Sequence, residues 1–500
     1  MRELIFDIDR TQQATLQSQI RATLVNAILS GQLPPGSPTP STRELARKLM
    51  VSRNTVTLAY LSMADDGYLE ARDRSGFYVA GDPAMFSQAP AAQKRSPTRD
   101  RPNFEALFRV RPSRQRNIEK PLNWHDYPYP FIYGQADPAL FPIAEWRECT
   151  RQSMNRKWLD AWTDDRYTED DPMLVDQIRQ RLLPRRGIQA GRDEILVTMG
   201  AQNALYLLAH LLMGSETSVG IENPGYPDAR NIFSLLAGEV VPLPVDKGGL
   251  ILGGELDRCS MVYTTPSHQF PTGVTMGIDR RRQLLEWARS GNRLIIEDDY
   301  EFEANYLAEP TPALKALDGN DPVIYVGSLS KSLMPGLRLG YLVAAPEIIS
   351  EARALRRLML RHPPGNNQRV AALFLALGYH DRLIGRLHRT YRERQALLSR
   401  ALDRHFPGWT PVSRFGGTSC WVTGPDWLNS QVLKEAALQK GVVIEPGEIF
   451  FADPDRPQNH FRLGFSSIPT DRIEQGVELL AGLIHAAELD PSQPGLRPLD

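Results

Sequence analysis

The chain has 500 residues, of which 42% are hydrophobic and 23% are charged. These proportions exclude an intrinsically disordered chain, and the length predicts about three domain-sized units. The formal net charge is -1, so the total charge neither requires nor excludes a nucleic-acid partner.

The cysteines and the apolar runs restrict the compartment. Cys149, Cys259 and Cys420 are widely separated and form no CxxC pair, which argues against a disulfide framework and against a zinc site or other metal site. Such sparse cysteines indicate a reducing, cytoplasmic location. The N-terminal residues lack the apolar stretch of a signal peptide, and the longest apolar run, 204–213, is too short to span a membrane. We therefore expect a cytoplasmic protein with no membrane contact.

The character of the sequence changes along the chain. Residues 1–80 carry short helical patterns and predict a small domain, whereas 121–490 alternates strand-like runs with helices and is followed by a tail at 491–500. Residues 81–120 are rich in Pro, Ala, Gln and Arg and predict a linker. From 94 to 120 the local charge is +6, which is equally consistent with a tether that touches DNA phosphates and with a solvated, self-repelling linker.

Three short helices are predicted in the first domain. The first carries apolar residues at every fourth position: Leu16, Ile20, Leu24 and Ile28. The second begins at Ser41, whose hydroxyl can cap the amide of Glu44. The third begins at Ser52 after a turn at 50–51. Two helices joined by so short a turn are typical of a helix-turn-helix.

The third helix opens with side chains that can read DNA. Arg53 can donate paired hydrogen bonds to a guanine edge or bind a phosphate, and Asn54 can pair with adenine in the same way. Residues 67–70 and 76–79 then predict a strand-turn-strand wing with two arginines at its tip. The candidate DNA-binding residues are Arg43, Ser52, Arg53, Asn54, Thr55, Thr57, Arg72 and Arg74. A small helical cap with surface arginines is the alternative.

The motifs of this domain resemble the winged helix of GntR-type repressors. The similar segments are Thr39-Pro-Ser-Thr-Arg-Glu-Leu-Ala46, Val51-Ser-Arg-Asn-Thr-Val56 and Gly67-Tyr-Leu69, and the resemblance covers nearly all of 14–79. It implies that the domain binds double-stranded operator DNA.

The long second part predicts an α/β domain. Short apolar runs at 195–197, 218–221, 261–263, 294–296 and 323–326 predict strands, and 201–212 predicts a helix. Continuous apolar strands separated by helices are typical of a mostly parallel sheet that is covered on both faces. In such a domain we expect the ligand site at the carboxyl ends of the strands.

A lysine stands in a glycine- and serine-rich string directly after the last of these strands. Lys331 lies within 327–340, and a lysine that captures an aldehyde needs such a rigid, polar setting. The hydroxyls of Ser328 and Ser330 and the guanidinium of Arg338 can bind a phosphate. The alternative, a solvated surface lysine, is weak in this string.

Other polar residues follow neighbouring strands. Asp298 could keep a pyridine nitrogen protonated, and Tyr300 could bond an oxygen on the same ring, although both could also belong to an ordinary acidic loop. Tyr226 could stack on a flat ring or fill the core. The predicted helix after the first strand opens with residues whose amides can bind phosphate: Gly200, Ala201 and Gln202.

Together these motifs resemble the fold-type I aminotransferases over roughly 125–488. The resemblance implies pyridoxal 5'-phosphate as cofactor, with Lys331 forming its Schiff base, Asp298 at the pyridine nitrogen, Tyr300 at the 3-oxygen and Tyr226 stacked on the ring. It implies that the phosphate is held by Gly200, Ala201, Gln202, Ser328, Ser330 and Arg338.

Two further segments bear on catalysis. Residues 459–465 resemble the aminotransferase segment whose arginine, here Arg462, binds the carboxylate of the substrate or effector. The family's Asn-Pro-Thr-Gly is replaced here by Phe270-Pro-Thr-Gly273, so the asparagine that usually bonds the 3-oxygen is missing. This departure puts catalytic turnover in doubt but leaves cofactor binding unaffected.

A winged helix, a linker and an aminotransferase-like domain in this order resemble the MocR subfamily of bacterial regulators, over nearly the whole chain. The resemblance implies a homodimer that controls genes of amine or vitamin B6 metabolism. We therefore expect a pyridoxal-phosphate-dependent transcription regulator that responds to a small amino compound. The alternatives are a working aminotransferase with an accessory DNA-binding module, and a sensor of pyridoxal phosphate itself.

Overall fold

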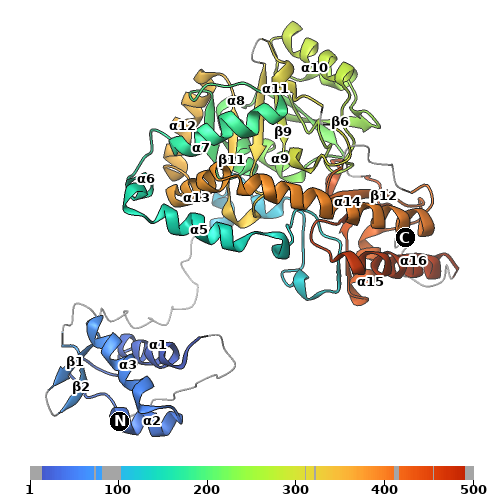
Figure 1. Cartoon of the computed structure of the whole chain (residues 1–500). Coiled ribbons are helices and arrows are strands. Elements are labelled where there is room, and N and C mark those ends of the chain that lie inside the picture. The colour runs from blue at the N-terminus through green and yellow to red at the C-terminus, as the bar shows by residue number, and fades with distance from the viewer. Residues whose placement is uncertain are drawn as a thin grey trace. The chain divides into compact units, whose positions relative to one another are not determined.

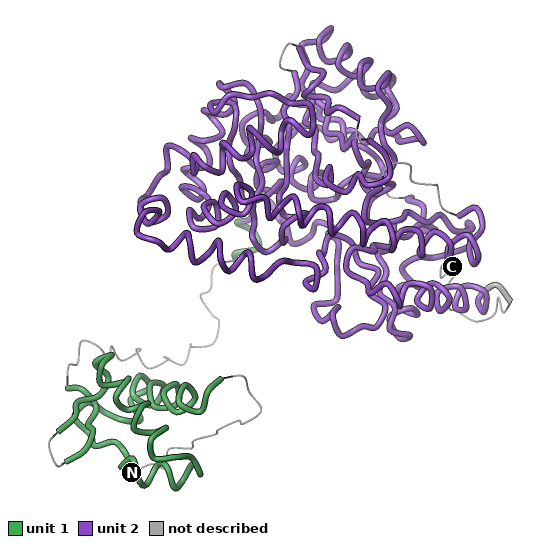
Figure 2. The backbone as a smooth tube through the Cα atoms, viewed as in Figure 1, with its two compact units in different colours: residues 1–107 green, residues 108–500 purple. Residues whose placement is uncertain are grey.

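The computed structural model describes residues 14–72, 75–81, 103–309, 311–319, 322–409, 416–453 and 455–489. The chain forms two compact units, residues 1–107 and residues 108–500 (Figure 2). Each unit has its own core, and each is described by itself below.

The first unit is built from helices and one small antiparallel sheet. Its elements are α1 (Leu16–Leu29), α2 (Thr42–Leu49), α3 (Arg53–Asp65), β1 (Leu69–Arg72), β2 (Gly76–Val79) and α4 (Phe104–Leu107). The predicted caps are confirmed, because the hydroxyl of Ser41 accepts from the Glu44 amide and that of Ser52 accepts from the Thr55 amide. Met50, in the left-handed conformation, makes the short turn between α2 and α3.

The wing differs from its predicted bounds. The first strand begins at Leu69 rather than at Gly67, because Gly67 lies in the turn that follows α3 with a φ of 77°. The strand extends to Arg72, which pairs with Gly76, so the predicted position of Arg72 at the tip of the wing was wrong. Arg74 lies outside the described residues.

The second unit is centred on an eight-stranded sheet with strand order β4-β11-β10-β9-β8-β5-β6-β7 (Figure 1). The strands are β4 (Ile195–Thr198), β5 (Ser218–Asn223), β6 (Glu239–Asp246), β7 (Gly249–Leu250), β8 (Met261–Thr264), β9 (Leu294–Asp299), β10 (Val323–Ser328) and β11 (Gly340–Val343). All five predicted strands are present. Strands β10, β9, β8, β5 and β6 pair in parallel, but β11 runs antiparallel to both of its neighbours and β7 is antiparallel to β6, so the sheet is mixed.

Helices cover both faces of this sheet. Ile296 on β9 packs into a core cluster with Leu205 of α8, whereas its neighbour Ile295 packs into another cluster with Leu284 of α10. The helices are α5 (Ile143–Ser153), α6 (Asp160–Thr163), α7 (Pro172–Gln177), α8 (Ala201–Leu212), α9 (Pro227–Phe233), α10 (Ile278–Ser290), α11 (Leu314–Leu317), α12 (Pro346–Leu360), α13 (Gly365–Ala376), α14 (Tyr379–His405), α15 (Ser430–Gln439) and α16 (Ile473–Leu489). The predicted helix 201–212 is confirmed by α8.

The C-terminal part of the unit adds two small sheets. One consists of β12 (Ser419–Thr423), β15 (His460–Gly464) and β14 (Glu445–Pro446), and the other pairs β13 (Val442–Val443) with β3 (Tyr129–Pro130). The long helix α14 runs across the unit (Figure 1). Among the residues that the structure describes, no helix combines the length and the apolar character needed to cross a membrane.

Part of the basic stretch 81–120 packs on the second unit. Within 115–120, which we call the strap, the Gln115 amide donates to the Asn231 carbonyl at 2.9 Å and Arg116 donates to the Phe451 carbonyl at 2.9 Å. The side-chain amide of Asn231 donates in return to the Arg116 carbonyl at 2.8 Å. These contacts fix the strap against the domain that follows it in the chain.

A buried ion pair holds the carboxyl end of β9. Arg186 Nε donates to Asp299 Oδ2 at 2.6 Å, and the Tyr325 hydroxyl donates to the same oxygen at 2.9 Å. Arg186 is 2% exposed and Asp299 is 1% exposed. Burial disfavours the ionised carboxylate, but the Arg186 guanidinium holds the pKa of Asp299 below its usual value.

We predict that Asp299→Ala lowers the free energy of unfolding of the second unit by about 3 kcal/mol or more, because it leaves the Arg186 guanidinium buried without its counterion. Urea unfolding followed by tryptophan fluorescence measures this loss selectively, since all eight tryptophans lie within 108–500. The matched control is Glu255→Ala, which breaks the exposed pair with Arg258 and should cost less than about 1 kcal/mol. Equal losses in the two variants would contradict the prediction.

Candidate functional site

A cavity of about 260 Å³ lies at the carboxyl ends of the parallel strands of the second unit. It brings together nine predicted site residues from different strand ends and loops: Ala201, Gln202, Tyr226, Asp298, Tyr300, Ser328, Ser330, Lys331 and Arg338. Arg462, on β15, lines the same cavity. The strand ends therefore place the candidate residues as the predicted α/β fold requires.

Lys331 lies at the centre of these residues. Its Nζ is 4.4 Å from the ring centroid of Tyr133. Gly134, with a φ of 76°, leaves room for the amine, because a Cβ at this position would lie 2.6 Å from Lys331 Nζ. Burial lowers the pKa of Lys331 to about 8, although the nearby Glu301 carboxylate acts in the opposite direction. Near neutral pH an appreciable fraction of this amine is therefore uncharged and nucleophilic.

Asp298 presents a buried carboxylate with one oxygen in use. The Tyr263 hydroxyl donates to Oδ2 at 2.8 Å, whereas Oδ1 is buried and accepts no hydrogen bond from the described residues. Burial raises the pKa of Asp298 to about 7, and the hydrogen bond from Tyr263 opposes this rise. A buried oxygen in this state needs a donor, and the N–H of a protonated ring nitrogen in the cavity would supply one.

The opposite end of the cavity suits a phosphate. Gly200, with a φ of 84°, precedes the first residue of α8, and within the described chain no side chain caps this helix. Arg338 lies beside it and donates to the Met199 carbonyl at 3.0 Å. Ser328 Oγ accepts from the Ser330 amide at 3.2 Å. The helix N-terminus, the guanidinium and the serine hydroxyls together can bind an anion.

Aromatic side chains form the sides of the cavity. The Tyr226 hydroxyl donates to Asp228 Oδ2 at 3.0 Å, and its ring packs edge-on against Phe270 with the centroids 5.2 Å apart. The Tyr300 hydroxyl donates to the His268 carbonyl at 2.9 Å, so only its oxygen lone pairs remain for a ligand. Phe270 lines the cavity where the aminotransferase pattern has an asparagine, and it offers a ligand no hydrogen bond.

Arg462 is 1% exposed and is enclosed by aromatic rings. Its guanidinium carbon is 4.1 Å from the Tyr133 ring centroid and 4.5 Å from that of Phe270. Arg462 Nε donates to Glu445 Oε2 at 2.8 Å, whereas Nη1 makes no hydrogen bond within the described part of the chain. The pair with Glu445 orients the guanidinium and leaves donor capacity toward the cavity.

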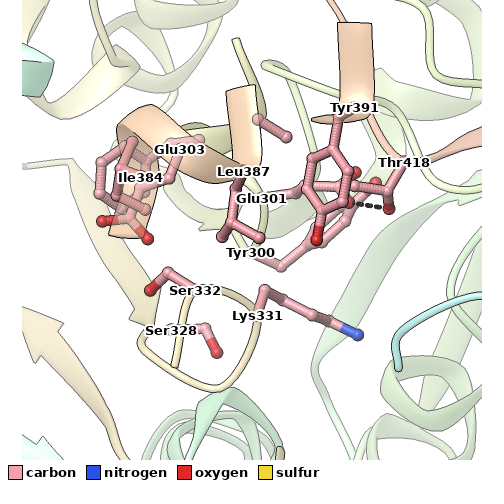
Figure 3. A pocket seen from close by; sticks show the side chains of 12 residues that line it. Tyr300, Glu301, Glu303, Ser328, Lys331, Ser332, Ile384, Leu387, Tyr391 and Thr418 are labelled. Carbon is pink, nitrogen blue, oxygen red and sulfur yellow. Dashed lines mark hydrogen bonds between the residues drawn. The ribbon is translucent and has the colours of Figure 1, made fainter. Parts of the chain in front are cut away.

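A second, smaller cavity shares Tyr300, Ser328 and Lys331 with the first (Figure 3). Glu301 reaches into it, and the Thr418 hydroxyl donates to its carboxylate, as the dashed line in Figure 3 marks. Burial raises the pKa of Glu301, and its hydrogen bond with Thr418 and the Lys331 charge counteract this effect. Glu301 and Glu303 thus both line the smaller cavity together with Lys331.

Several site residues were not found from the sequence: Lys120, Tyr133, Gly134, Tyr263, Glu301 and Glu445. Lys120 was counted with the linker, and Tyr133 and Gly134 stand in a short apolar run without a recognisable motif. Glu445 carries a weak signal, because it is a lone acidic residue directly after the apolar run Val442–Ile444, where a buried charge needs a partner.

In the first unit the predicted DNA-binding residues lie on α2, α3 and the wing. Arg43, Arg53 and Asn54 are exposed. The hydroxyls of Ser52 and Thr55 lie 2.8 Å apart in a mutual hydrogen bond, and the Thr57 hydroxyl donates to the Arg53 carbonyl at 2.9 Å. Arg72 is exposed, with its guanidinium carbon 4.2 Å from the Tyr78 ring centroid. Arg43, Arg53, Asn54 and Arg72 are thus exposed, whereas the hydroxyls of Ser52, Thr55 and Thr57 make hydrogen bonds within the unit.

Known families match both units. Residues 16–79 match the family of bacterial regulatory proteins called gntR, and residues 142–480 match aminotransferase class I and II. The HTH-type transcriptional regulator TauR of Rhodobacter capsulatus is 43% identical over 472 residues, which cover 94% of this chain and 96% of that protein. The probable rhizopine catabolism regulatory protein MocR of Rhizobium meliloti is 29% identical over 498 residues, which cover 99% of this chain and 98% of that protein.

A solved structure agrees with these matches. The kynurenine aminotransferase of Pyrococcus horikoshii, solved in complex with PMP, aligns with a TM-score of 0.68 and 29% identity over 82% of this chain and 99% of its own. The relatives of similar length are regulators, and the fold of the second unit is that of an aminotransferase. The chain therefore belongs to the MocR subfamily of GntR-type transcription regulators, in which a winged helix-turn-helix is joined to a fold-type I aminotransferase domain.

Proposed function

We propose that this regulator binds pyridoxal 5'-phosphate in the cavity around Lys331 and that a small amino compound entering this cavity changes the affinity of the first unit for operator DNA. The observation that carries the proposal is the buried Asp298 Oδ1, which has no donor among the described residues, in the same cavity as Lys331, whose pKa is lowered by burial. The combination is what a protonated pyridine ring bearing an aldehyde requires.

Each of these residues of the cavity would bind a different part of this cofactor. Asp298 would accept from the ring nitrogen, the Tyr226 ring would stack on the pyridine, and Lys331 would attach covalently. The phosphate would be held by the backbone amides of Gly200, Ala201 and Gln202 at the start of α8. Ser328, Ser330 and Arg338 would hold it as well. The bound cofactor supplies an aldehyde carbon at which amines exchange reversibly.

The effector would be recognised by charge. Arg462 has donor capacity toward the cavity, and an amino compound that carries a carboxylate or a sulfonate would bind there. A compound that binds one conformation of the second unit more tightly shifts the protein toward that conformation, and linkage then requires operator affinity to change as well.

The first unit would read the operator as a winged helix-turn-helix. Arg53 and Asn54 at the start of α3 would enter the major groove, and Arg43, Arg72 and Arg74 would bind phosphates. Ser52, Thr55 and Thr57 would support the start of this helix and add contacts to the backbone of the DNA. A homodimer in the bacterial cytoplasm would place two such helices on two half-sites.

A second candidate function is transamination, because both Lys331 and Asp298 stand in one cavity of an aminotransferase fold. Phe270 stands against it, since it removes a hydrogen bond to the ring that the aminotransferase pattern supplies. Sustained turnover of an amino donor with a keto acid would favour this candidate. Operator binding that responds to cofactor alone would instead favour a sensor of pyridoxal phosphate.

We predict that Lys331→Ala abolishes the visible absorbance that wild-type protein acquires on incubation with pyridoxal phosphate, because the attachment point is lost. Absorbance spectra and mass spectrometry after borohydride reduction measure this, and Lys247→Ala, at an exposed lysine, is the control that should keep the colour. A reduced adduct on another lysine of Lys331→Ala would show that the attachment site is wrongly assigned.

We predict that Arg53→Ala weakens operator binding by about 10- to 100-fold, the cost of one bidentate base contact. The operator is selected by wild-type protein from random duplexes, and Kd is measured by fluorescence anisotropy at fixed salt. Arg21→Ala removes the same charge from α1, where Arg21 pairs with Asp66, and should change Kd less than threefold. Binding of Arg53→Ala at wild-type affinity would disprove the choice of recognition helix.

We predict that Lys331 in cofactor-free protein is acetylated with a half-maximal extent near pH 8, because burial lowers the pKa of its ammonium group. Glu301→Gln should move this midpoint to lower pH, because the Glu301 carboxylate that is removed stabilises the charged form of Lys331. Peptide mass spectrometry across a pH series measures both midpoints. A midpoint that stays in place or rises in Glu301→Gln would show that Glu301 does not act on the lysine.

A further inference from the structure

The strap supplies one wall of the cofactor cavity. Ile118 and Lys120 line this cavity together with Lys331 and Arg462. Lys120 Nζ donates to the Tyr133 carbonyl and lies 3.4 Å from Glu445 Oε1. A segment that directly follows the connection between the two units in the chain thus places a cation inside the ligand site.

Lys120 and Lys331 approach the same point in the cavity. The position that a Cβ on Gly134 would occupy lies 2.6 Å from Lys331 Nζ and 3.9 Å from Lys120 Nζ. The absence of a side chain at Gly134 therefore leaves space between the two amines. A ligand whose amine reacts near Lys331 would have its neighbouring atoms within reach of Lys120.

The charges around this space are unequal. Glu445, which is 2% exposed, serves two cations: its Oε1 faces Lys120 and its Oε2 accepts from Arg462. One carboxylate is thus shared by an ammonium and a guanidinium, so among these three groups one positive charge is unmatched, and the Glu301 carboxylate also acts on Arg462. Burial also lowers the pKa of Lys120, although the Glu445 charge opposes this effect, so a further anion would stabilise its charged form.

We propose that Lys120 is a second ligand, beside Arg462, for the acidic group of the effector, and that it makes the site selective for amines that carry an anion a short distance from the amine. This inference rests on the proposed function, because it deepens what the same cavity recognises. An anion bound by Lys120 competes with Glu445 for the ammonium group and thereby changes how the strap is held. The changed contacts of the strap then transmit the binding of a ligand in the cavity to the residues that lead to the DNA-binding unit.

The test compares acidic amines with neutral amines of matched length. Protein loaded with pyridoxal phosphate is titrated with β-alanine and 2-aminoethanesulfonate, and in parallel with 3-aminopropanol and ethanolamine, while the visible spectrum is followed. Lys120→Ala should raise the Kd of both acidic amines by about 10- to 100-fold, the loss of one charge-assisted hydrogen bond, and that of the amino alcohols less than threefold. Lys120→Arg should recover most of the loss.

Arg114→Ala is the matched control, because it removes an exposed positive charge from the residues just before the strap. This variant should leave the Kd unchanged for both the acidic and the neutral amines. Hydrogen–deuterium exchange at 115–120 is a second readout: acidic amines should alter it in wild-type protein but not in Lys120→Ala. Equal weakening of both classes of amine in Lys120→Ala, or no weakening, would overturn the proposal.

Failure of the proposed function gives different results. Wild-type protein that stays colourless with pyridoxal phosphate contradicts cofactor binding itself. If coloured protein responds to no amine, sodium methanesulfonate alone decides the role of Lys120: it should alter exchange at the strap in wild-type protein and not in Lys120→Ala. No difference between the two proteins would overturn the inference about Lys120.

Discussion

Charged groups buried at the carboxyl edge of the large sheet determine how the second unit is organised. Removing an ion from water is costly, so each buried charge must find an opposite charge or a hydrogen-bond donor nearby. Asp299 has Arg186, and Glu445 has Arg462 and Lys120. Asp298 has the Tyr263 hydroxyl as donor to one oxygen, and its other oxygen, like one oxygen of Asp299, has no donor among the described residues. The aromatic side chains of the cavity, Gly134 and the loop that carries Ser328 and Ser330 all surround this oxygen of Asp298.

The same constraint governs the contacts that hold the strap. The strap is held by hydrogen bonds to carbonyl groups at one end and by a shared carboxylate at the other. Of these contacts, only the ion pair between Lys120 and Glu445 involves a charged group whose place an anionic ligand can take. Under the proposed function, the contact that a ligand can alter would lie in the strap, within the first residues of the second unit.

Local patterns predicted much of the fold. The serine caps of α2 and α3, the bounds of α8 and the strands β4, β5, β8, β9 and β10 follow from hydrogen-bonding side chains and apolar runs that act over a few residues. The antiparallel strand β11 was not predicted, because strand direction depends on the path of the chain between strands. The first strand of the wing begins two residues later than predicted, because Gly67 belongs to the turn that ends α3, whereas the second strand, Gly76–Val79, is confirmed.

The site was predicted where its residues follow strands in recognisable strings, as with Asp298, Lys331 and Arg338. Lys120 and Glu445 could not be found in this way, since they lie more than 300 residues apart in the sequence and have meaning only as a pair. Composition assigned Lys120 to the linker because basic residues precede it, yet the fold turns its side chain into the cavity. Pairs of charges distant in sequence are visible only once the chain is folded.

The two adjacent aspartates of β9 fix the alignment of this strand. Because neighbouring side chains on a strand point to opposite faces, Asp298 meets Tyr263 on one side of the sheet and Asp299 meets Arg186 on the other. A shift by a single residue that moved Asp299 into the place of Asp298 would put Tyr300 opposite Arg186 and leave that guanidinium without its anion. The two adjacent aspartates thus specify the register of β9, although in the sequence they look like a simple duplication.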